Sequence, residues 1–448
     1  DVYKRQVWGM TQAAPELVHW LLKLGVKFNM SGYDDVDLRN FGGQKKKRTA
    51  FAQSDTGKQI MTAMIDAVRR KEASGMVERF SHHSFLTLRL CGNICCGCVI
   101  RDEYSQETVE LPGDAVIVAT GGMHGLFGNT TGSLSNTGEV TAELFRLGVP
   151  LANGEMIQYH PTTVKCGGKR MLISEAARGE GGRLFAMKDG KQWYFMEEKY
   201  PELGNLMPRD ITAREIWKVS HESEVFLDMT EISEEIISNK LSGLADDCMT
   251  YLHKDIRKEP VSVLPGIHYF MGGILVDEQH RTPIQNLYAA GECCAQYHGA
   301  NRLGGNSLLG ALYGGRVAAK SACEQADVVD LSCATQIDFP PASQISEIKQ
   351  LNKVMQETMG VVRNENTLLN GIQTVQALTG NLPLLGMAVL KSALARKESR
   401  GAHWREDYPK SNDDDYLKTT VARFDGKQIQ ISFVPCLLYT SPSPRDCS

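Results

Sequence analysis

The sequence predicts an α/β protein in which a parallel sheet is interrupted by a mixed α+β segment and followed by a helical domain. Two buried strands, in Asp114–Gly122 (DAVIVATGG) and Asn286–Glu292 (NLYAAGE), both run into small residues and glycine. Such strands are typical of a parallel α/β sheet, where glycines let a ligand approach the backbone. The pattern changes at Glu155, returns to sheet at Gly266, and becomes helical from Gln344.

Length and composition are those of an ordinary globular protein with more than one domain. The chain has 448 residues, of which 42% are hydrophobic and 23% charged, and its formal net charge is -4. That length predicts two or three domains, and the mildly acidic balance argues against a nucleic-acid partner bound over the whole surface. No run of about 18 or more apolar residues occurs, so we expect no membrane-spanning helix.

The first third of the chain alternates amphipathic helices with strands. Apolar residues recur at helical spacing in Met10–Gly25 and Gln59–Lys71, so two helices are expected there. The basic run Lys45–Arg48 between them is typical of a solvated loop. Three strands are expected next, at Phe85–Leu90, Cys96–Arg101 and Thr108–Leu111.

The cysteine cluster Cys91–Cys98 has two interpretations. The chain has 12 cysteines, and this cluster superficially resembles a metal site. However, Cys95, Cys96 and Cys98 lie on a predicted strand, and no second pair with matching spacing follows. Reduced thiols in a reducing cytoplasm are therefore expected, with a metal site as the weaker alternative.

Polar residues of catalytic type gather after the first buried strand. Ser135 and Asn136 are candidates for the cap of a helix that Gly148 ends.

Beyond Glu155, three segments place polar residues of catalytic type in apolar surroundings. They are Met156–Thr162 (MIQYHPT), Leu172–Gly182 (LISEAARGEGG) and Gly204–Arg214 (GNLMPRDITAR).

The stretch Tyr297–Gly310 (YHGANRLGGNSLLG) presents Arg302 inside a glycine-rich turn that leads into a predicted helix. Free backbone N–H groups, a helix N-terminus and a guanidinium at one place suit a phosphate or carboxylate ligand. Taken alone, such a turn is more often a device for close helix–strand packing. The three polar segments make a ligand site the better hypothesis.

Eight separated motifs, in this order and spacing, resemble the flavoprotein subunit of succinate dehydrogenase and fumarate reductase (FAD-dependent oxidoreductase family 2). The motifs are NTGE, IQYHPT, SEAARGEGGRL, GNLMPRD, HYFMGG, AAGE, HGANRLGGNSLLGALYGG and ESRGAHWREDYP. The resemblance covers about residues 7–434. It implies a Rossmann-like FAD-binding domain that is interrupted by an α+β capping domain and followed by a helical domain.

The resemblance also implies domain boundaries. We expect a FAD-binding domain at 7–154 and 266–330, a capping domain at 155–265, a helical domain at 340–412 and a strand region at 413–434. No glycine-rich diphosphate loop opens the chain, so an N-terminally truncated fragment with an incomplete FAD-binding domain is expected. Residues 1–6 and 435–448 resemble translated adapter sequence and are expected to be artefactual tails.

For the flavin, the resemblance implies contacts along two strand ends and one helix start. The residues are Thr120, Gly121, Gly122, Glu139, Glu292, Ser307 and Leu308. Glu139 stands where the family usually has aspartate, and Glu292 would bond a ribityl hydroxyl. Ser307 and Leu308 would face the pyrimidine edge of the flavin, where the helix dipole favours negative charge.

For the substrate, the resemblance implies a C4 dicarboxylate, succinate or fumarate, with each carboxylate held separately. Arg302 and His268 would bind one carboxylate, and His160, Ser174 and Glu175 the other. Family members commonly have threonine where Ser174 stands, so the hydroxyl is kept. Taken singly, His160 and His268 would be interpreted as core histidines bonded to backbone.

Arg209 matches the family arginine that exchanges a proton with the substrate carbon. A guanidinium is a weak acid, with a pKa above about 12, so the proton must be resupplied quickly. The resemblance provides a relay through Glu175 and Arg178. Taken alone, Arg209 would be interpreted as the salt-bridge partner of neighbouring Asp210.

The resemblance therefore implies interconversion of succinate and fumarate by hydride exchange with N5 of FAD. Because no cluster-ligand pattern is evident in this chain, electrons would pass to or from an iron–sulfur subunit and a quinone. We expect a cytoplasmic position on the inner face of the membrane, through that subunit and indirectly a membrane anchor subunit. The alternatives are an L-aspartate oxidase and a catalytically dead fragment that only presents a docking surface.

Overall fold

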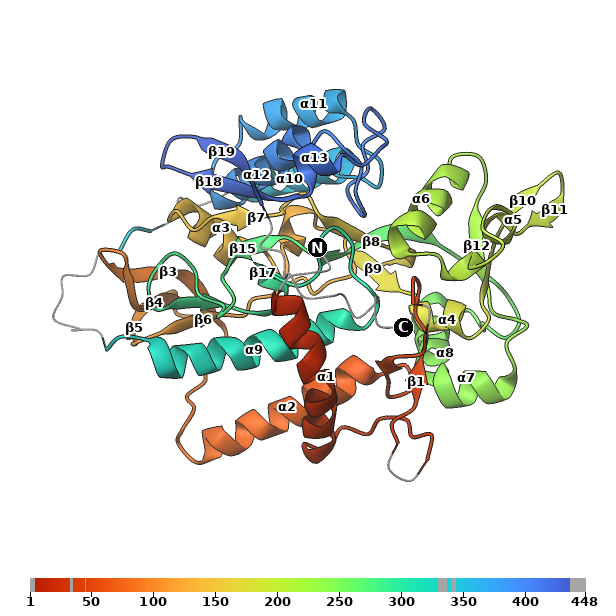
Figure 1. Cartoon of the computed structure of the whole chain (residues 1–448), viewed down its shortest axis with the longest axis horizontal. Coiled ribbons are helices and arrows are strands. Elements are labelled where there is room, and N and C mark those ends of the chain that lie inside the picture. The colour runs from red at the N-terminus through yellow and green to blue at the C-terminus, as the bar shows by residue number, and fades with distance from the viewer. Residues whose placement is uncertain (1–4, 33–34, 45, 329–336, 340–343, 436–448) are drawn as a thin grey trace.

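The computed structural model describes residues 5–32, 35–44, 46–328, 337–339 and 344–435. Figure 1 shows the helical domain at the top, the interrupting segment at the right, and the remaining elements around the long helix α9 (Asn306–Gln325). Most of the two expected tails, at 1–4 and 436–448, lies outside the described residues.

Two amphipathic helices and a small ribbon form the N-terminal part. The helices are α1 (Arg5–Lys23) and α2 (Thr56–Ala73), which confirms both predicted helices and extends each by a few residues. The ribbon pairs β1 (Leu38–Arg39) with β2 (Thr49–Ala50) in antiparallel register. Apolar side chains of both helices pack together and contact α9, so this part covers one side of that helix.

An antiparallel three-stranded sheet follows, made of β3 (His83–Cys91), β4 (Ile94–Asp102) and β5 (Thr108–Pro112). The three predicted strands are thus confirmed. Cys95, Cys96 and Cys98 carry free thiols, as expected. Cys91 departs from that expectation, because it is disulfide-bonded.

The two glycine-ending strands pair with each other. They are β6 (Val116–Val118) and β16 (Leu287–Ala289), parallel and in register from Val116 opposite Leu287. The parallel pairing that the sequence predicts is therefore confirmed. The next helix, α3 (Glu139–Arg146), corrects one expectation, because its N-cap is Gly138 in the left-handed region rather than Ser135 or Asn136.

A five-stranded sheet collects segments that lie far apart in the chain. Its order is β17 (Cys294–Ala295), β15 (Gly273–Leu275), β7 (Leu151–Ala152), β18 (Lys418–Phe424) and β19 (Ile429–Pro435). β7 and β15 are antiparallel neighbours, with Leu151 opposite Ile274. The interrupting segment therefore leaves and re-enters the rest of the molecule at adjacent strands.

The interrupting segment has two sheets and a hydrophobic core of its own. One sheet has the order β14 (Leu264–Phe270), β8 (Ile157–Cys166), β9 (Lys169–Leu172), and the other β11 (Lys191–Trp193), β10 (Arg183–Lys188), β12 (Val225–Asp228), β13 (Val261–Ser262). The helices are α4 (Glu175–Gly179), α5 (Phe195–Lys199), α6 (Arg209–Val219), α7 (Glu234–Lys240) and α8 (Ser242–Asp247). Their apolar side chains form one cluster, as in a separate folding unit.

The helical domain packs on the far side of the five-stranded sheet from the N-terminal helices (Figure 1). Its helices are α10 (Ile345–Thr358), α11 (Glu365–Val375), α12 (Asn381–Ala395) and α13 (Asp413–Tyr416). Eleven of the 15 residues of α12 are buried, because the helix lies among α3, α10, α11 and β18. The predicted α/β fold, with its interrupting α+β segment and helical domain, is confirmed.

Candidate functional site

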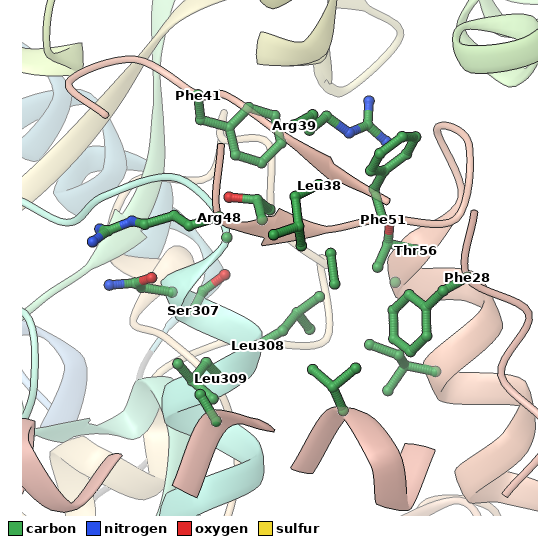
Figure 2. Close-up of a pocket in the computed structure, with 18 of the residues that line it drawn as sticks. Phe28, Leu38, Arg39, Phe41, Arg48, Phe51, Thr56, Ser307, Leu308 and Leu309 are labelled. Atoms are coloured by element: carbon green, nitrogen blue, oxygen red, sulfur yellow. The ribbon is translucent and has the colours of Figure 1, made fainter. Parts of the chain in front are cut away.

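A cavity of about 680 Å³ lies where the N-terminal helices, the interrupting segment and the start of α9 meet. Eight residues that the sequence singles out line it: His160, Ser174, Glu175, Arg209, His268, Arg302, Ser307 and Leu308. Figure 2 shows its apolar part, where Phe28 and Phe51 lie across from Leu308 on α9, and Arg48 lies above Ser307 in this view. Arg48 thus lines the cavity, although it belongs to the run expected to be a solvated loop.

Glu175 is the centre of the polar part. Arg209 donates to its Oε2 through Nε at 3.0 Å and Nη2 at 2.7 Å, and Arg178 donates to its Oε1 through Nη2 at 2.9 Å. The side chains are almost fully buried, with Glu175 exposed by 2% and Arg209 by 6%. Burial would raise the pKa of Glu175, but the two guanidiniums outweigh it and the net pKa is lowered. The carboxylate therefore stays ionised between two arginines.

The ion pair expected for Arg209 if it had only a structural role is absent from the described residues. Asp210 instead accepts from Asn301 and lies 3.9 Å from Arg214. Arg209 is thus directed into the cavity beside Glu175, and the simpler interpretation as a salt bridge to Asp210 is wrong.

Two glycines allow backbone to approach Glu175. A Cβ on Gly42 would lie 2.6 Å from Glu175 Oε1, and a Cβ on Gly304 would lie 2.7 Å from Oε2. Neither distance is compatible with an ordinary side chain. The carboxylate is therefore enclosed from two sides by glycine, in the segments FGG and RLGG.

The two predicted histidines lie next to each other in the lining of the cavity. The rings of His160 and His268 are 5.2 Å apart in an edge-to-face arrangement. Nδ1 of His268 is 2.8 Å from Thr131 Oγ1, and Nδ1 of His160 contacts the backbone of Thr162. Nε2 of His160 is buried and has no hydrogen-bond partner among the described residues. Burial lowers the pKa of both histidines well below the usual value, with a contribution from nearby Arg209, so both are neutral donors or acceptors at pH 7.

Arg302 is held by its neighbours without a carboxylate partner in the described part of the chain. Its guanidinium stacks 4.3 Å above the ring of Tyr269, and it is exposed by only 3%. Burial, together with nearby Arg209, lowers its pKa to about 9. Its Nε is buried and unpaired within the described residues. A buried guanidinium with a free N–H suits an anionic ligand.

The charges of the arginines and the carboxylate at this site do not cancel. Three guanidiniums, of Arg178, Arg209 and Arg302, face one carboxylate, of Glu175, in the described structure. Two positive charges are therefore left over beside neutral histidines. Ser174 adds a hydroxyl that accepts from the Ala176 N–H at 3.2 Å, which leaves its own hydrogen to donate. Two ligand carboxylates would balance this site.

The remaining predicted residues lie outside the lining of the cavity. Arg178 lies directly behind Glu175, whereas Thr120, Gly121, Gly122, Glu139 and Glu292 lie near the ends of β6 and β16 or at the start of α3. Glu292 accepts from the Phe270 N–H at 3.0 Å and lies 3.6 Å from His124. A Cβ on Gly122 would lie 2.7 Å from Glu292. Glu139 is solvent-exposed, so the predicted contact of its carboxylate stays a prediction.

Several residues that contact the predicted site were not singled out from the sequence. Gln158 accepts from Arg209, and Asn301 contacts Gln158, although both lie inside motifs that the sequence analysis quotes. Phe41 and Arg39 line the cavity from the segment around β1, where Arg39 stacks 3.8 Å from the ring of Phe51. The glycine pair after Phe41 was the available signal, because paired glycines mark a close backbone approach.

No group of three or more His, Cys, Asp or Glu side chains within the described ranges is placed to hold a metal ion. In the same part of the chain, no helix has both the length and the apolar composition that crossing a membrane requires.

Comparison with protein families identifies the cofactor. A family described as "FAD binding domain" matches residues 6–308, and one described as "Fumarate reductase flavoprotein C-term" matches residues 379–446. The cofactor is therefore FAD. The residues present fit it: α9 begins after Gly305, which has no side chain to cap the first turn, and Ser307 and Leu308 of that turn line the cavity. Gly122 leaves open a space beside Glu292 that a Cβ would fill.

Relatives and solved structures agree with this assignment. The succinate dehydrogenase flavoprotein subunit of Bacillus subtilis is 36% identical over 99% of this chain and 85% of its own length. The L-aspartate oxidase of Pyrococcus furiosus is 32% identical over 91% of this chain and 81% of its own length. The FrdA chain of Escherichia coli quinol fumarate reductase superposes with a TM-score of 0.87 at 26% identity, covering 99% of this chain and 86% of that one. The chain belongs to the succinate dehydrogenase and fumarate reductase family of FAD-dependent flavoproteins.

Proposed function

We propose that this protein interconverts succinate and fumarate. The observation that carries the proposal is the Glu175 carboxylate held between Arg178 and Arg209, beside two uncompensated positive charges at the cavity. A C4 dicarboxylate would balance those charges. Bound FAD supplies the hydride acceptor or donor at N5, and the residues of this chain orient the substrate and move the proton.

Each substrate carboxylate would have its own set of donors. Arg302 and His268 bind one, because the guanidinium has a free Nε–H and the ring lies beside it. His160 and Ser174 bind the other, with Glu175 behind them. Fixing both ends holds the two central carbons still, which lowers the entropic cost of the reaction.

The proton step uses Arg209. In fumarate reduction one alkene carbon gains the hydride and its neighbour gains a proton from the Arg209 guanidinium, so the double bond becomes a single bond. Arg209 then recovers a proton from Arg178 by way of the Glu175 carboxylate, to which both are hydrogen-bonded. Arg178 in turn takes up a proton that comes from solvent, which supplies the one proton consumed per fumarate. Succinate oxidation is the same sequence reversed. A carboxylate bonded to two guanidiniums is suited to this transfer because both arginines already donate to it.

The relatives support assembly with other proteins. The Bacillus subtilis relative is named as a subunit. We propose that electrons pass to or from an iron–sulfur subunit and then a quinone, and that a membrane anchor subunit holds the assembly at the cytoplasmic face of the membrane.

The test compares fumarate reduction by a reduced dye in the FAD-loaded wild-type protein and in Arg209→Lys. Lysine keeps the positive charge but not the bidentate contact with Glu175. We expect turnover to fall by about 10³-fold or more, since removing a group that acts only in the transition state lowers kcat. Binding of malonate, followed by the flavin absorbance, should change by less than about tenfold.

The competing activity is oxidation of L-aspartate, which the Pyrococcus furiosus relative brings into consideration. The same preparations are therefore assayed with aspartate. Wild-type protein that oxidises aspartate and is inactive with fumarate and succinate would replace our proposal with that one. Protein that fails to hold FAD and turns over neither substrate would support a catalytically dead fragment.

A further inference from the structure

Gln158 on β8 stands between the two arginines of the site. Its Oε1 accepts from Arg209 Nη1 at 3.0 Å, and its Nε2 donates to Asn301 Oδ1 at 2.9 Å and to the Arg302 carbonyl at 2.7 Å. The side chain is fully buried. One amide therefore contacts both the side chain that would exchange the proton and the backbone of the residue that would bind a carboxylate.

The bonds continue through Asn301 and return to the starting point. Asn301 Nδ2 donates to Asp210 Oδ1 at 2.7 Å, and Asp210 follows Arg209 directly on α6. These contacts close a ring of four residues: Arg209, Gln158, Asn301 and Asp210. Three hydrogen bonds and the peptide bond between Arg209 and Asp210 link them. The ring joins β8, α6 and the loop before α9, so it connects the interrupting segment with the rest of the molecule.

The direction of every bond in this ring is fixed by chemistry. A guanidinium only donates and an ionised carboxylate only accepts. Arg209 is therefore the donor at one end of the three hydrogen bonds, and Asp210 is the acceptor at the other end. Reversing the Gln158 amide would face its NH2 toward Arg209 and its oxygen toward Asn301 Oδ1 and the Arg302 carbonyl. Three favourable contacts would become repulsive, and the buried polar groups would be left unpaired. The ring has one arrangement.

We propose that this four-residue ring positions the Arg209 guanidinium. It aligns that group with the substrate only when the loop carrying Arg302 is in place. This inference rests on the proposed function. Glu175 fixes one edge of the guanidinium through Nε and Nη2, and Gln158 fixes the opposite nitrogen, Nη1. Without Gln158 the plane of the guanidinium can tilt about the Glu175 contact. Gln158 and Asn301 touch no reacting atom in this scheme, so they act through Arg209.

The test uses three variants of the FAD-loaded protein: Gln158→Met, Asn301→Leu and the double variant. Each single change removes the ring bonds while keeping side-chain volume. We expect each to lower kcat for fumarate by about 10- to 100-fold, because a misplacement of about 1 Å costs that much. KM and malonate binding should change by less than about threefold, and the solvent deuterium isotope effect on kcat should rise, since proton transfer becomes slower.

The ring acts as a unit, so the double variant should cost no more than the costlier single variant. Gln296→Met is the matched control: Gln296 is also a buried amide that donates to a carbonyl, at Asp277, but it does not line the cavity. It should leave kcat and the isotope effect unchanged. Asn301→Leu tests the same ring independently if Gln158→Met fails to fold.

Two results would overturn the inference while leaving the proposed function intact. One is wild-type turnover of fumarate together with unchanged kcat in Gln158→Met and Asn301→Leu. The other is additive losses seen mainly in KM, with no change in the isotope effect. A wild-type protein that binds malonate but turns over neither fumarate nor succinate would overturn the proposed function, and the inference with it.

Discussion

At the scale of single residues, the Glu175 carboxylate is closely held by its neighbours. Both of its oxygens accept from arginines, and glycines lie against both. Its rotamer is therefore held by contacts on every side rather than by its own preference. A carboxylate that passes protons between two guanidiniums needs such fixed distances, because proton transfer requires hydrogen-bond contact.

We expect Gly42→Ala to disturb this arrangement. Gly42 has no positive φ, so alanine causes no backbone strain there, but its Cβ would lie 2.6 Å from Glu175 Oε1 and 3.0 Å from the Met207 carbonyl. The carboxylate oxygen that accepts from Arg178 must then shift. Steady-state fumarate reduction should fall by about tenfold or more, because small misplacements are costly.

Gly57→Ala is the control for this change. Gly57 also lines the cavity, yet a Cβ there would meet no atom of the described residues within 4 Å. The control variant should keep wild-type turnover. Equal activity of Gly42→Ala and Gly57→Ala would show that the close approach to Glu175 is unimportant.

The sequence predicted the charged and ring-bearing members of the site more readily than their neighbours. Arg209, Glu175, His160, His268 and Arg302 stand out because each has a chemical role that motifs mark. Gln158 and Asn301 are ordinary polar residues in the same motifs, and their importance depends on three-dimensional contacts between segments that are more than 140 residues apart. Local pattern carries no information on such contacts.

At the scale of elements, α6 brings together three parts of the molecule. Its first turn supplies Arg209 to Glu175 and Asp210 to Asn301. One turn later, Arg214 stacks 4.0 Å above the ring of Trp404, which belongs to the segment after α12. The position of the Arg209 guanidinium therefore depends on the helical domain as well as on the cavity.

We expect Trp404→Leu to loosen α6 without removing any group from the cavity. A cation–π contact of this kind contributes about 0.5–2 kcal/mol, so amide hydrogen exchange in α6 should become faster. Trp193→Leu is the control, because Trp193 contacts Lys188 in the hairpin of β10 and β11 instead. Unchanged exchange in α6 of the Trp404 variant would contradict this coupling.

The segment Glu398–Leu417 shows where element-level prediction stops. In the sequence this segment is charged and rich in turn-forming residues. In the structure Glu398, His403 and Arg405 are buried, and Arg396 donates to both Glu155 and Glu398. Composition indicates solvent for such charges, whereas mutual pairing is what keeps them inside. The predicted N-cap of α3 was wrong for a different reason: Gly138, in the left-handed region, occupies the position where a polar side chain was expected.

At the scale of the whole molecule, buried histidines link stability to pH. Burial lowers the pKa of His160, His268 and His403 well below the usual value, and lowers that of His298 to about 3. In the unfolded chain each titrates near about 6.5. As pH falls below that value the unfolded chain binds protons that the folded protein does not, so stability is lost on acidification.

We therefore expect the unfolding temperature of the FAD-loaded protein to drop clearly between pH 7.5 and pH 5.5. Each such histidine costs about 1.4 kcal/mol for every pH unit below about 6.5. Thermal unfolding at constant ionic strength measures the effect. A flat profile over this range would mean that these histidines titrate in the folded protein as they do in the unfolded chain.

The arrangement of the five-stranded sheet has a consequence for how the protein is made. β7 ends at Ala152 and β15 begins at Gly273, but β18, which pairs with β7, begins only at Lys418. During synthesis β7 leaves the ribosome long before β18 exists, since chains grow at about 5–20 residues per second. The nascent chain must keep an unpaired apolar edge for that time, whereas the interrupting segment already has a complete core. Assistance by a chaperone during translation would matter most in that interval.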